Sequence, residues 1–371
     1  MTTLNRILDL AVQIQQIPAP TFDEAARAQF VLEKFRAEGL TDVGKDSAGN
    51  VFARLSGGTR SPLVISAHLD TVFPTATSLA ARREGNRIYG PGIGDNSLGV
   101  AGMFGLVWML REQGASLPGD LWLVANTCEE GLGDLKGMKA ICERFGPTPL
   151  CYLVVEGMAL GHIYYRGTGV RRYRVTVHTQ GGHSWTDFGR PSAIHELSKL
   201  AAQIAALKIP STPRTTFNIG RIGGGTSINT IAPEAWLELD LRSEGATQLS
   251  DLARRVESLL ETVNQRGLTR NFERGVRVES EVIGQRPAGE IPMSHPIIKL
   301  AQSILREFGI EPSLTIGSTD ANIPLSLGYP ALVLGITRGK GAHTIGEYIE
   351  TGPVAEGMEQ LLQFVSKAWD V

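Results

Sequence analysis

The residues LVISAHLD, at positions 63–70, form an apolar run that ends in a histidine and an aspartate. A run this short with so few polar residues is typical of a strand buried on both faces, as in a parallel or mixed sheet covered by helices. Similar runs recur at Leu121–Ala125, Cys151–Val155 and Ala331–Ile336, and a helical stretch, Leu98–Leu110, lies between two of them. The chain is therefore predicted to be an α/β protein.

Residues 168–284 follow a different pattern. Tyr173, Val175 and Val177 alternate with polar residues, which is typical of a half-buried antiparallel strand. The segments that follow predict a helix, two strands, a helix and a final strand. This β-α-β-β-α-β order is the split arrangement of a ferredoxin-like domain. We therefore expect a larger domain, built from residues 1–167 and 285–371, with a smaller domain inserted at 168–284.

Composition excludes several classes of protein. The 371 residues carry 36 basic and 38 acidic side chains, so the formal charge of −2 gives no general attraction to nucleic acid or to a membrane surface. Three cysteines encode neither a disulfide framework nor a cysteine zinc site. The N-terminal segment lacks the pattern of a signal peptide, and Leu98–Leu110 is too short to span a bilayer. We expect a cytoplasmic protein.

Acidic residues and histidines follow the apolar runs, and a further acidic residue, Asp95, lies just before the Leu98–Leu110 helix. The ligand site of an open α/β sheet lies at the carboxyl ends of its strands, so these side chains are expected to meet at one edge. Mixed histidine and carboxylate ligands favour zinc, manganese or cobalt. The carboxylates outnumber what one metal needs, which makes two metals about 3.5–4 Å apart plausible. The set comprises His68, Asp70, Asp95, Glu129, Glu130, Glu156 and His343.

Six motifs occur in the order AHLDTV (67–72), GPGIGDN (90–96), EEG (129–131), a lone acid after a strand (Glu156), GGHS (181–184) and GAHT (341–344). Together they resemble the dinuclear-metal peptidase and deacylase family, which includes peptidase T, carboxypeptidase G, aminoacylase and succinyl-diaminopimelate desuccinylase. The resemblance covers nearly the whole chain. It implies a zinc-exopeptidase-like α/β/α catalytic domain with a mixed, mostly parallel sheet, and an inserted ferredoxin-like lid and dimerisation domain.

The resemblance also implies a role for each ligand. His68 and Glu156 would bind one metal, Glu130 and His343 would bind the other, and Asp95 would bridge the two. The cofactor would be two divalent ions, with Zn²⁺ favoured and Mn²⁺ or Co²⁺ as alternatives.

Other residues match the family's catalytic positions. Glu129 would be the general base that takes a proton from a metal-activated water and passes it to the leaving amine. Asp70 would orient the imidazole of His68. His183 would reach the active site of a neighbouring subunit and stabilise the oxyanion, which implies a homodimer formed through the inserted domain.

Three positions match substrate-binding residues of the family. Asn229 lies in a matching glycine-rich loop, Arg242 matches an arginine that anchors a substrate carboxylate, and Thr319 lies in a less specific match, GSTDAN. The expected activity is hydrolysis of the peptide bond in short, carboxylate-bearing peptides. An N-acyl-amino-acid deacylase is the alternative, because Glu156 is typical of the carboxypeptidase and deacylase branches. A family member that has lost catalysis is a further alternative, disfavoured because all the ligands are present.

Overall fold

The computed structural model describes residues 2–269 and 275–371. The chain divides into two compact units, here called unit 1 (Met1–Gly167 with Gly289–Val371) and unit 2 (Thr168–Ala288). The return to unit 1 comes four residues later than the expected position 285, because the next strand of the chain, β15 (Gly289–Glu290), is the first that pairs in the sheet of unit 1.

Unit 1 is built on a nine-stranded sheet in the order β1-β2-β6-β3-β7-β17-β8-β15, with β16 also paired to β8. The four middle strands, β6, β3, β7 and β17, are parallel to one another. They coincide with the four apolar runs of the sequence, which confirms the prediction of a mixed, mostly parallel sheet. The strands are β1 (Thr41–Lys45), β2 (Val51–Leu55), β3 (Arg60–His68), β6 (Gly119–Asn126), β7 (Cys151–Glu156), β8 (His162–Gly167), β15 (Gly289–Glu290), β16 (Ser313–Gly317) and β17 (Ala331–Gly335).

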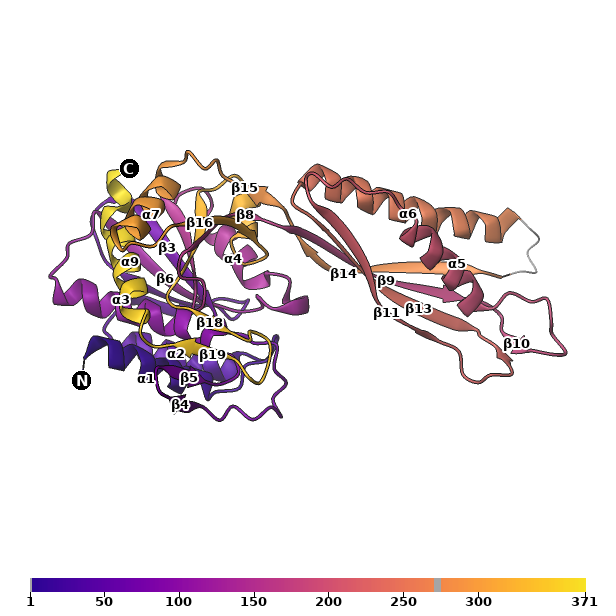
Figure 1. Ribbon diagram of the computed structural model, residues 1–371, viewed down its shortest axis with the longest axis horizontal. Helices are drawn as coiled ribbons and strands as arrows, with labels where there is room; N and C mark the ends of the chain where they lie inside the picture. The colour runs from indigo at the N-terminus through magenta and orange to yellow at the C-terminus, as the bar shows by residue number, and fades with distance from the viewer. Residues whose placement is uncertain (1, 270–274) are drawn as a thin grey trace. The chain divides into compact units, whose positions relative to one another are not determined.

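Helix α3 (Leu98–Glu112) is the central helix of unit 1 and packs on β3 and β7 as well as on α1 and α9 (Figure 1). Its glycines permit this close packing, since a Cβ on Gly102 would lie 2.3 Å from Ile336 and one on Gly105 would lie 2.5 Å from Ile7. The other helices of unit 1 are α1 (Thr3–Gln15), α2 (Ala25–Ala37), α4 (Lys136–Phe145), α7 (Pro296–Glu307), α8 (Asn322–Ser326) and α9 (Val354–Lys367).

The helical stretch Ile93–Glu112 extends beyond the apolar run seen in the sequence. By length and composition it could cross a membrane, and it is the one such stretch within residues 2–269 and 275–371. However, 89% of its most apolar part is buried inside the structure, as expected for a core helix.

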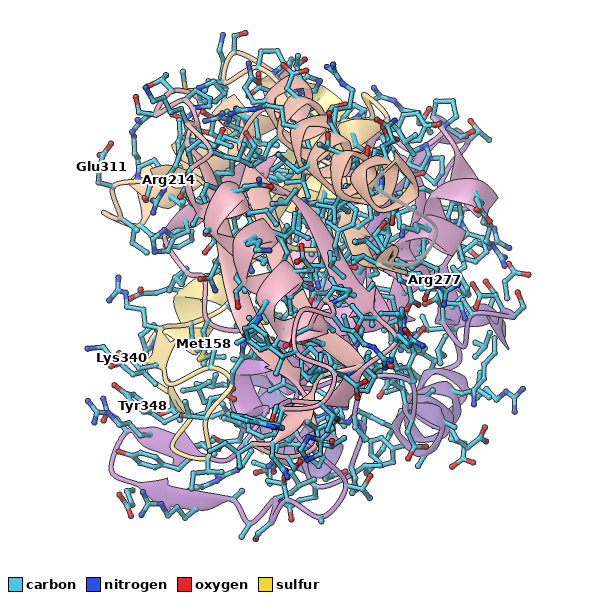
Figure 2. The ribbon with its side chains drawn as sticks, turned by 90° about the vertical axis from the view of Figure 1, so that its right-hand side faces the viewer. Met158, Arg214, Arg277, Glu311, Lys340 and Tyr348 are labelled. Carbon is cyan, nitrogen blue, oxygen red and sulfur yellow. The ribbon has the colours of Figure 1, made fainter. Side chains whose placement is uncertain are left out.

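A second, small sheet in unit 1 has the order β18-β19-β5-β4 and was not predicted. Its strands are β4 (Arg82–Glu84), β5 (Arg87–Tyr89), β18 (Gly339–Lys340) and β19 (Tyr348–Glu350). Lys340 and Tyr348, both marked in Figure 2, are register partners, and the Tyr348 ring lies 5.2 Å from that of Tyr89. Because this sheet joins β19 to β5, the segment that carries His343 is held beside the segment that leads to Asp95.

Unit 2 has a four-stranded antiparallel sheet in the order β11-β13-β9-β14. The strands of this sheet and the helices follow the order β9-α5-β11-β13-α6-β14, which is the β-α-β-β-α-β order predicted for a ferredoxin-like fold. Helices α5 and α6 share one core with the sheet (Figure 1). Leu237, Leu239 and Leu241 face that core, and Asp240 and Arg242 lie on the opposite face of the strand. The elements are β9 (Gly169–His178), β10 (Gly182–His183), α5 (Ala193–Ala205), β11 (Thr215–Gly224), β12 (Thr230–Ile231), β13 (Glu234–Ser243), α6 (Ala246–Thr269) and β14 (Arg277–Arg286).

Candidate metal centre

The parallel strands of unit 1 end in polar residues at the same edge of the sheet. His68 is the last residue of β3 and is in register with Asn126, the last residue of β6. Glu156 is the last residue of β7, in register with Gly335 of β17. Because the strands run in the same direction, the side chains that follow them converge at one edge, where ligand sites of α/β proteins lie.

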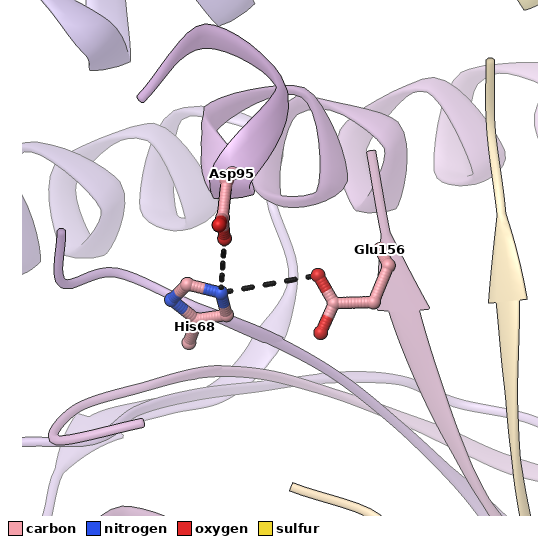
Figure 3. A group of neighbouring side chains, drawn as sticks. All are labelled: His68, Asp95 and Glu156. Carbon is pink, nitrogen blue, oxygen red and sulfur yellow. Dashed lines mark ion pairs between the residues drawn. The ribbon is translucent and has the colours of Figure 1, made fainter. Parts of the chain in front are cut away.

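The first cluster of possible ligands forms around His68 (Figure 3). Its Nε2 lies 3.0 Å from Oδ1 of Asp95 and 3.9 Å from Oε2 of Glu156. The imidazole is 2% exposed, so the chain around it fixes its orientation. One nitrogen and two carboxylate oxygens therefore point at a common centre.

The second cluster forms around His343, whose Nε2 lies 3.1 Å from Oδ2 of Asp95 and 3.0 Å from Oε1 of Glu130. Asp95 is thus shared, with one carboxylate oxygen directed to each histidine. It can be shared because it lies in the irregular turn Ile93–Ser97 that leads into α3, so its side chain projects between the two clusters.

Asp70 organises the turn that carries the two adjacent glutamates. Its Oδ1 accepts a hydrogen bond from the Glu129 amide (2.9 Å), and its Oδ2 accepts from the Glu130 amide (2.8 Å) and from the Thr21 hydroxyl (3.0 Å). Nδ1 of His68 lies 3.0 Å from the main-chain oxygen of Asp70 and 3.6 Å from its Oδ1. The position of His68 and those of both glutamates therefore depend on this one residue.

Glu129 is buried beside the first cluster. One of its carboxylate oxygens, a ring nitrogen of His68 and a carboxylate oxygen of Glu130 all lie within 4.8 Å of one another. The carboxylate is therefore close enough to either cluster to exchange a proton with a molecule bound there.

Both histidines have a raised pKa. For His68, burial lowers the pKa, but hydrogen bonds to Asp70 and Asp95 outweigh burial and leave the pKa well above its usual value. For His343, hydrogen bonds to Asp95 and Glu130 raise the pKa to about 10. In the metal-free protein, positively charged imidazoles hold the carboxylates together.

The pKa values of Glu156 and Asp95 are shifted in opposite directions. Burial raises the pKa of Glu156 to about 8, although the charge on His68 opposes it. Burial also acts to raise the pKa of Asp95, but hydrogen bonds from His343 and His68 hold it well below its usual range. A compact set of two imidazoles and several carboxylates fits divalent zinc, manganese or cobalt, and the sharing of Asp95 fits a pair of such ions.

The other predicted site residues lie elsewhere. In unit 2, His183 is in register with Thr230, and the main-chain oxygen of Asn229 accepts from Ser184, so His183 and Asn229 are neighbours. Arg242 is eight residues along β13 from Glu234, which separates them by roughly 26 Å at the usual rise of a strand. Glu234 starts β13 shortly after β12, the strand that pairs with His183, so Arg242 lies near the end of β13 that is remote from the β10–β12 pair.

Thr319 lies in unit 1, in the turn between β16 and α8, where its amide donates to Oδ1 of Asn322 (3.0 Å). The next residue, Asp320, is fully buried and accepts a hydrogen bond from Nδ2 of Asn126 (2.7 Å). Asn126 ends β6 in register with His68. Its hydrogen bond to Asp320 therefore connects the turn of Thr319 to the edge of the sheet where the two clusters lie.

Three buried charged residues near the site were missed from the sequence. Arg27 donates to the main-chain oxygen of Leu69, Glu24 accepts from the Cys128 amide, and Glu347 accepts from amides of the segment 92–95. A signal existed for Arg27, which shares a helical face with Val31 and Phe35. Each has at least one backbone partner distant in the sequence, which no local pattern reveals, although Arg27 also donates to the main-chain oxygen of Ile17 and Glu24 also accepts from the Phe22 amide.

Comparison with known proteins identifies the family. Residues 64–367 match Peptidase family M20/M25/M40. A succinyl-diaminopimelate desuccinylase of Corynebacterium glutamicum is 26% identical over 366 residues, which cover 96% of this chain and 95% of that protein. A tripeptidase from Staphylococcus aureus has a TM-score of 0.83 at 23% identity, with 99% of both chains covered.

A dinuclear metal-binding peptidase of the M20 family from Bacillus subtilis has a TM-score of 0.70 at 14% identity, with 98% of both chains covered. The resemblance inferred from the six motifs is thus confirmed. By the match over residues 64–367, the chain belongs to Peptidase family M20/M25/M40.

Proposed function

We propose that this protein hydrolyses the peptide bond of short peptides that carry a free carboxylate, with water as the nucleophile and Glu129 as the general base. Membership of the M20 family makes the chain a metal-dependent peptidase or amidohydrolase, which confirms the prediction of a hydrolase, and two divalent ions are the cofactor of such an enzyme. The observation that carries the proposal is the pair of clusters that share Asp95.

In this proposal, His68 and Glu156 hold one ion, Glu130 and His343 hold the other, and Asp95 contributes one oxygen to each. Two divalent ions at this place supply a water that is nucleophilic at neutral pH and polarise the scissile carbonyl. Zinc is the proposed native metal, and manganese and cobalt suit the same ligands.

Glu129 accepts the proton of the attacking water and delivers it to the leaving amine. Its burial beside His68 and Glu130, and the fixed position of its amide on Asp70, support this role. Asp70 is a positioning residue, because the Glu129 and Glu130 amides share its carboxylate.

Unit 2 supplies substrate contacts in this proposal. Arg242 binds the substrate carboxylate through its planar guanidinium, and Asn229 and His183 contact the substrate near the scissile carbonyl. A tripeptide spans only about 10 Å. This is less than the roughly 26 Å between Arg242 and the start of β13, the end of the strand that follows the β10–β12 pair of His183, so one tripeptide is not expected to contact both residues of one copy. We therefore propose a homodimer, in which His183 of one copy serves the site of the other.

The substrate class has two candidates. A peptide substrate is favoured by the tripeptidase among the structural neighbours, and Thr319 would lie in a substrate-binding turn. A deacylase acting on N-acyl amino acids is favoured by the similarity to a succinyl-diaminopimelate desuccinylase along nearly the whole chain. A cytoplasmic location stays a prediction from the sequence.

A product screen by mass spectrometry distinguishes the candidates. Metal-reconstituted protein is given dipeptides, tripeptides, and N-acetyl and N-succinyl amino acids, with a Glu129→Ala variant as the blank. Release of amino acids from peptides alone supports the peptidase, and the first residue released identifies the end that is cleaved. Turnover of acylated amino acids alone makes the protein a deacylase. If protein with two bound metals turns over none of these substrates, the result contradicts both candidate activities and supports a family member that has lost catalysis.

A further inference from the structure

Glu347 is a fully buried acid that lies outside the proposed ligand set. Its carboxylate accepts three backbone hydrogen bonds from one short segment. Oε2 accepts from the Gly92 amide at 2.7 Å, and Oε1 accepts from the Gly94 amide at 2.8 Å and from the Asp95 amide at 2.9 Å. All three donors lie within four residues, and the last belongs to the residue shared by both clusters.

The segment is shaped to present these amides together. Gly92 has φ of 75°, a conformation that a side chain strains, and a Cβ there would lie 2.8 Å from Cγ2 of Thr71. Backbone amides that point to one side in such a turn form a concavity for an anion. Here the acceptor is the carboxyl group of a side chain of the same protein, so the turn that carries Asp95 is built around Glu347.

Glu347 also connects the two segments that carry ligands. It follows His343 by four residues, and its own main-chain oxygen accepts from the Gly90 amide at 3.0 Å. Side chain and main chain together therefore join the loop of His343 to residues 90–95. Because Oδ2 of Asp95 lies 3.1 Å from Nε2 of His343, this junction determines how the two ligands face one another.

We propose that Glu347 is a second positioning residue of the metal pair: it holds the backbone of Asp95 so that the carboxylate can reach both metals, and its loss weakens metal binding. The inference rests on the proposed metal site. It assigns to Glu347 no contact with metal or substrate, only the placement of Asp95.

The test is a titration of metal-free protein with Co²⁺, followed by the visible absorption of the bound ion. Wild type is expected to bind two equivalents. In Glu347→Gln the new amide group turns a donor toward either Gly92 or the Gly94 and Asp95 pair, so at least one amide loses its acceptor. Loss of such an outer partner weakens metal binding by about 10–100-fold. At saturating Co²⁺ the variant should recover most of its kcat with an unchanged KM.

Asp120→Asn is the matched control, because Asp120 also accepts a backbone hydrogen bond, from Gly57 at 2.9 Å. It lies six residues before Asn126 on β6, roughly 20 Å from the end of the strand that meets the site. This variant should bind both equivalents with the affinity of wild type. Equal weakening in both variants would mean that general destabilisation explains the effect and would overturn the proposal.

Wild-type affinity for both Co²⁺ ions in Glu347→Gln also overturns the inference. If wild type itself binds fewer than two ions, the proposed metal site fails instead, so the two failures are distinguishable. Should Glu347→Gln not fold, hydrogen exchange of metal-free wild type decides. The amides of Gly92, Gly94 and Asp95 must exchange more slowly than those of the exposed turn at Gly85, and equal rates refute the proposal.

Discussion

Replacing Asp70 with asparagine tests how the catalytic turn is held. Its carboxylate accepts from the amides of Glu129 and Glu130 and from the hydroxyl of Thr21. Asparagine has the same shape but only one acceptor oxygen, so its amide group must face one of the two backbone donors. A hydrogen bond to a charged acceptor contributes about 1.5–3 kcal/mol, and the remaining bonds weaken when the acceptor becomes neutral.

We therefore expect Asp70→Asn to lower the free energy of unfolding of the metal-free protein by about 2–4 kcal/mol, which urea denaturation measures. In the metal-loaded protein, misplacement of Glu129 should lower kcat by about 10–100-fold with little change in KM. Thr21→Val is the control, because it removes one of the three hydrogen bonds and leaves both glutamate amides bound; its cost should be about 1 kcal/mol. Stability and kcat within error of wild type in Asp70→Asn would refute the reasoning.

Further predictions concern the base, the substrate anchor and the ligands. Glu129→Ala should keep both metals, measured by elemental analysis, but lose nearly all turnover; full activity contradicts its role as base. Arg242→Ala should mainly raise KM for free-acid substrates, and equal losses on amidated ones would count against the anchor. Because the pKa values of His68, His343 and Glu156 are raised, these groups carry protons at pH 7 in the metal-free protein. Metal binding should release about two to three protons, and the affinity for metal should rise with pH. Calorimetry in buffers of different ionisation enthalpy measures the number of protons released, and a value of zero would contradict this prediction.

The sheet of unit 1 was predictable at its centre and not at its edges. Apart from the half-buried Trp122, the four apolar runs are buried on both faces, so their continuous apolar sequences indicate central strands directly. Strand β8 has three consecutive half-buried residues, Tyr164, Tyr165 and Arg166, and β16 is half-buried for most of its length, so neither strand appears in the sequence as an apolar run. The strands of the small sheet have only two or three residues, too few for any period to show.

The candidate site was predictable in its residue types and in its place at the strand ends. The division of Asp95 between two histidines was expected only from the resemblance to the family. The spacing of the residues alone does not give it, because it depends on the backbone of the turn Ile93–Ser97, which departs from helical geometry at Asp95 and Asn96. Glu347 and Arg27 were missed for a related reason. A buried charge is stabilised by the backbone groups that surround it, and only the folded chain brings those groups together.

The central claim is that Asp95 lies between two metals. Anomalous scattering from a crystal of the zinc-loaded protein tests it most directly. The expected result is two peaks about 3.5–4 Å apart, one beside His68 and Glu156 and the other beside Glu130 and His343, with Asp95 in contact with both. A single peak, or two peaks of which neither touches Asp95, would contradict the proposed two-metal hydrolase.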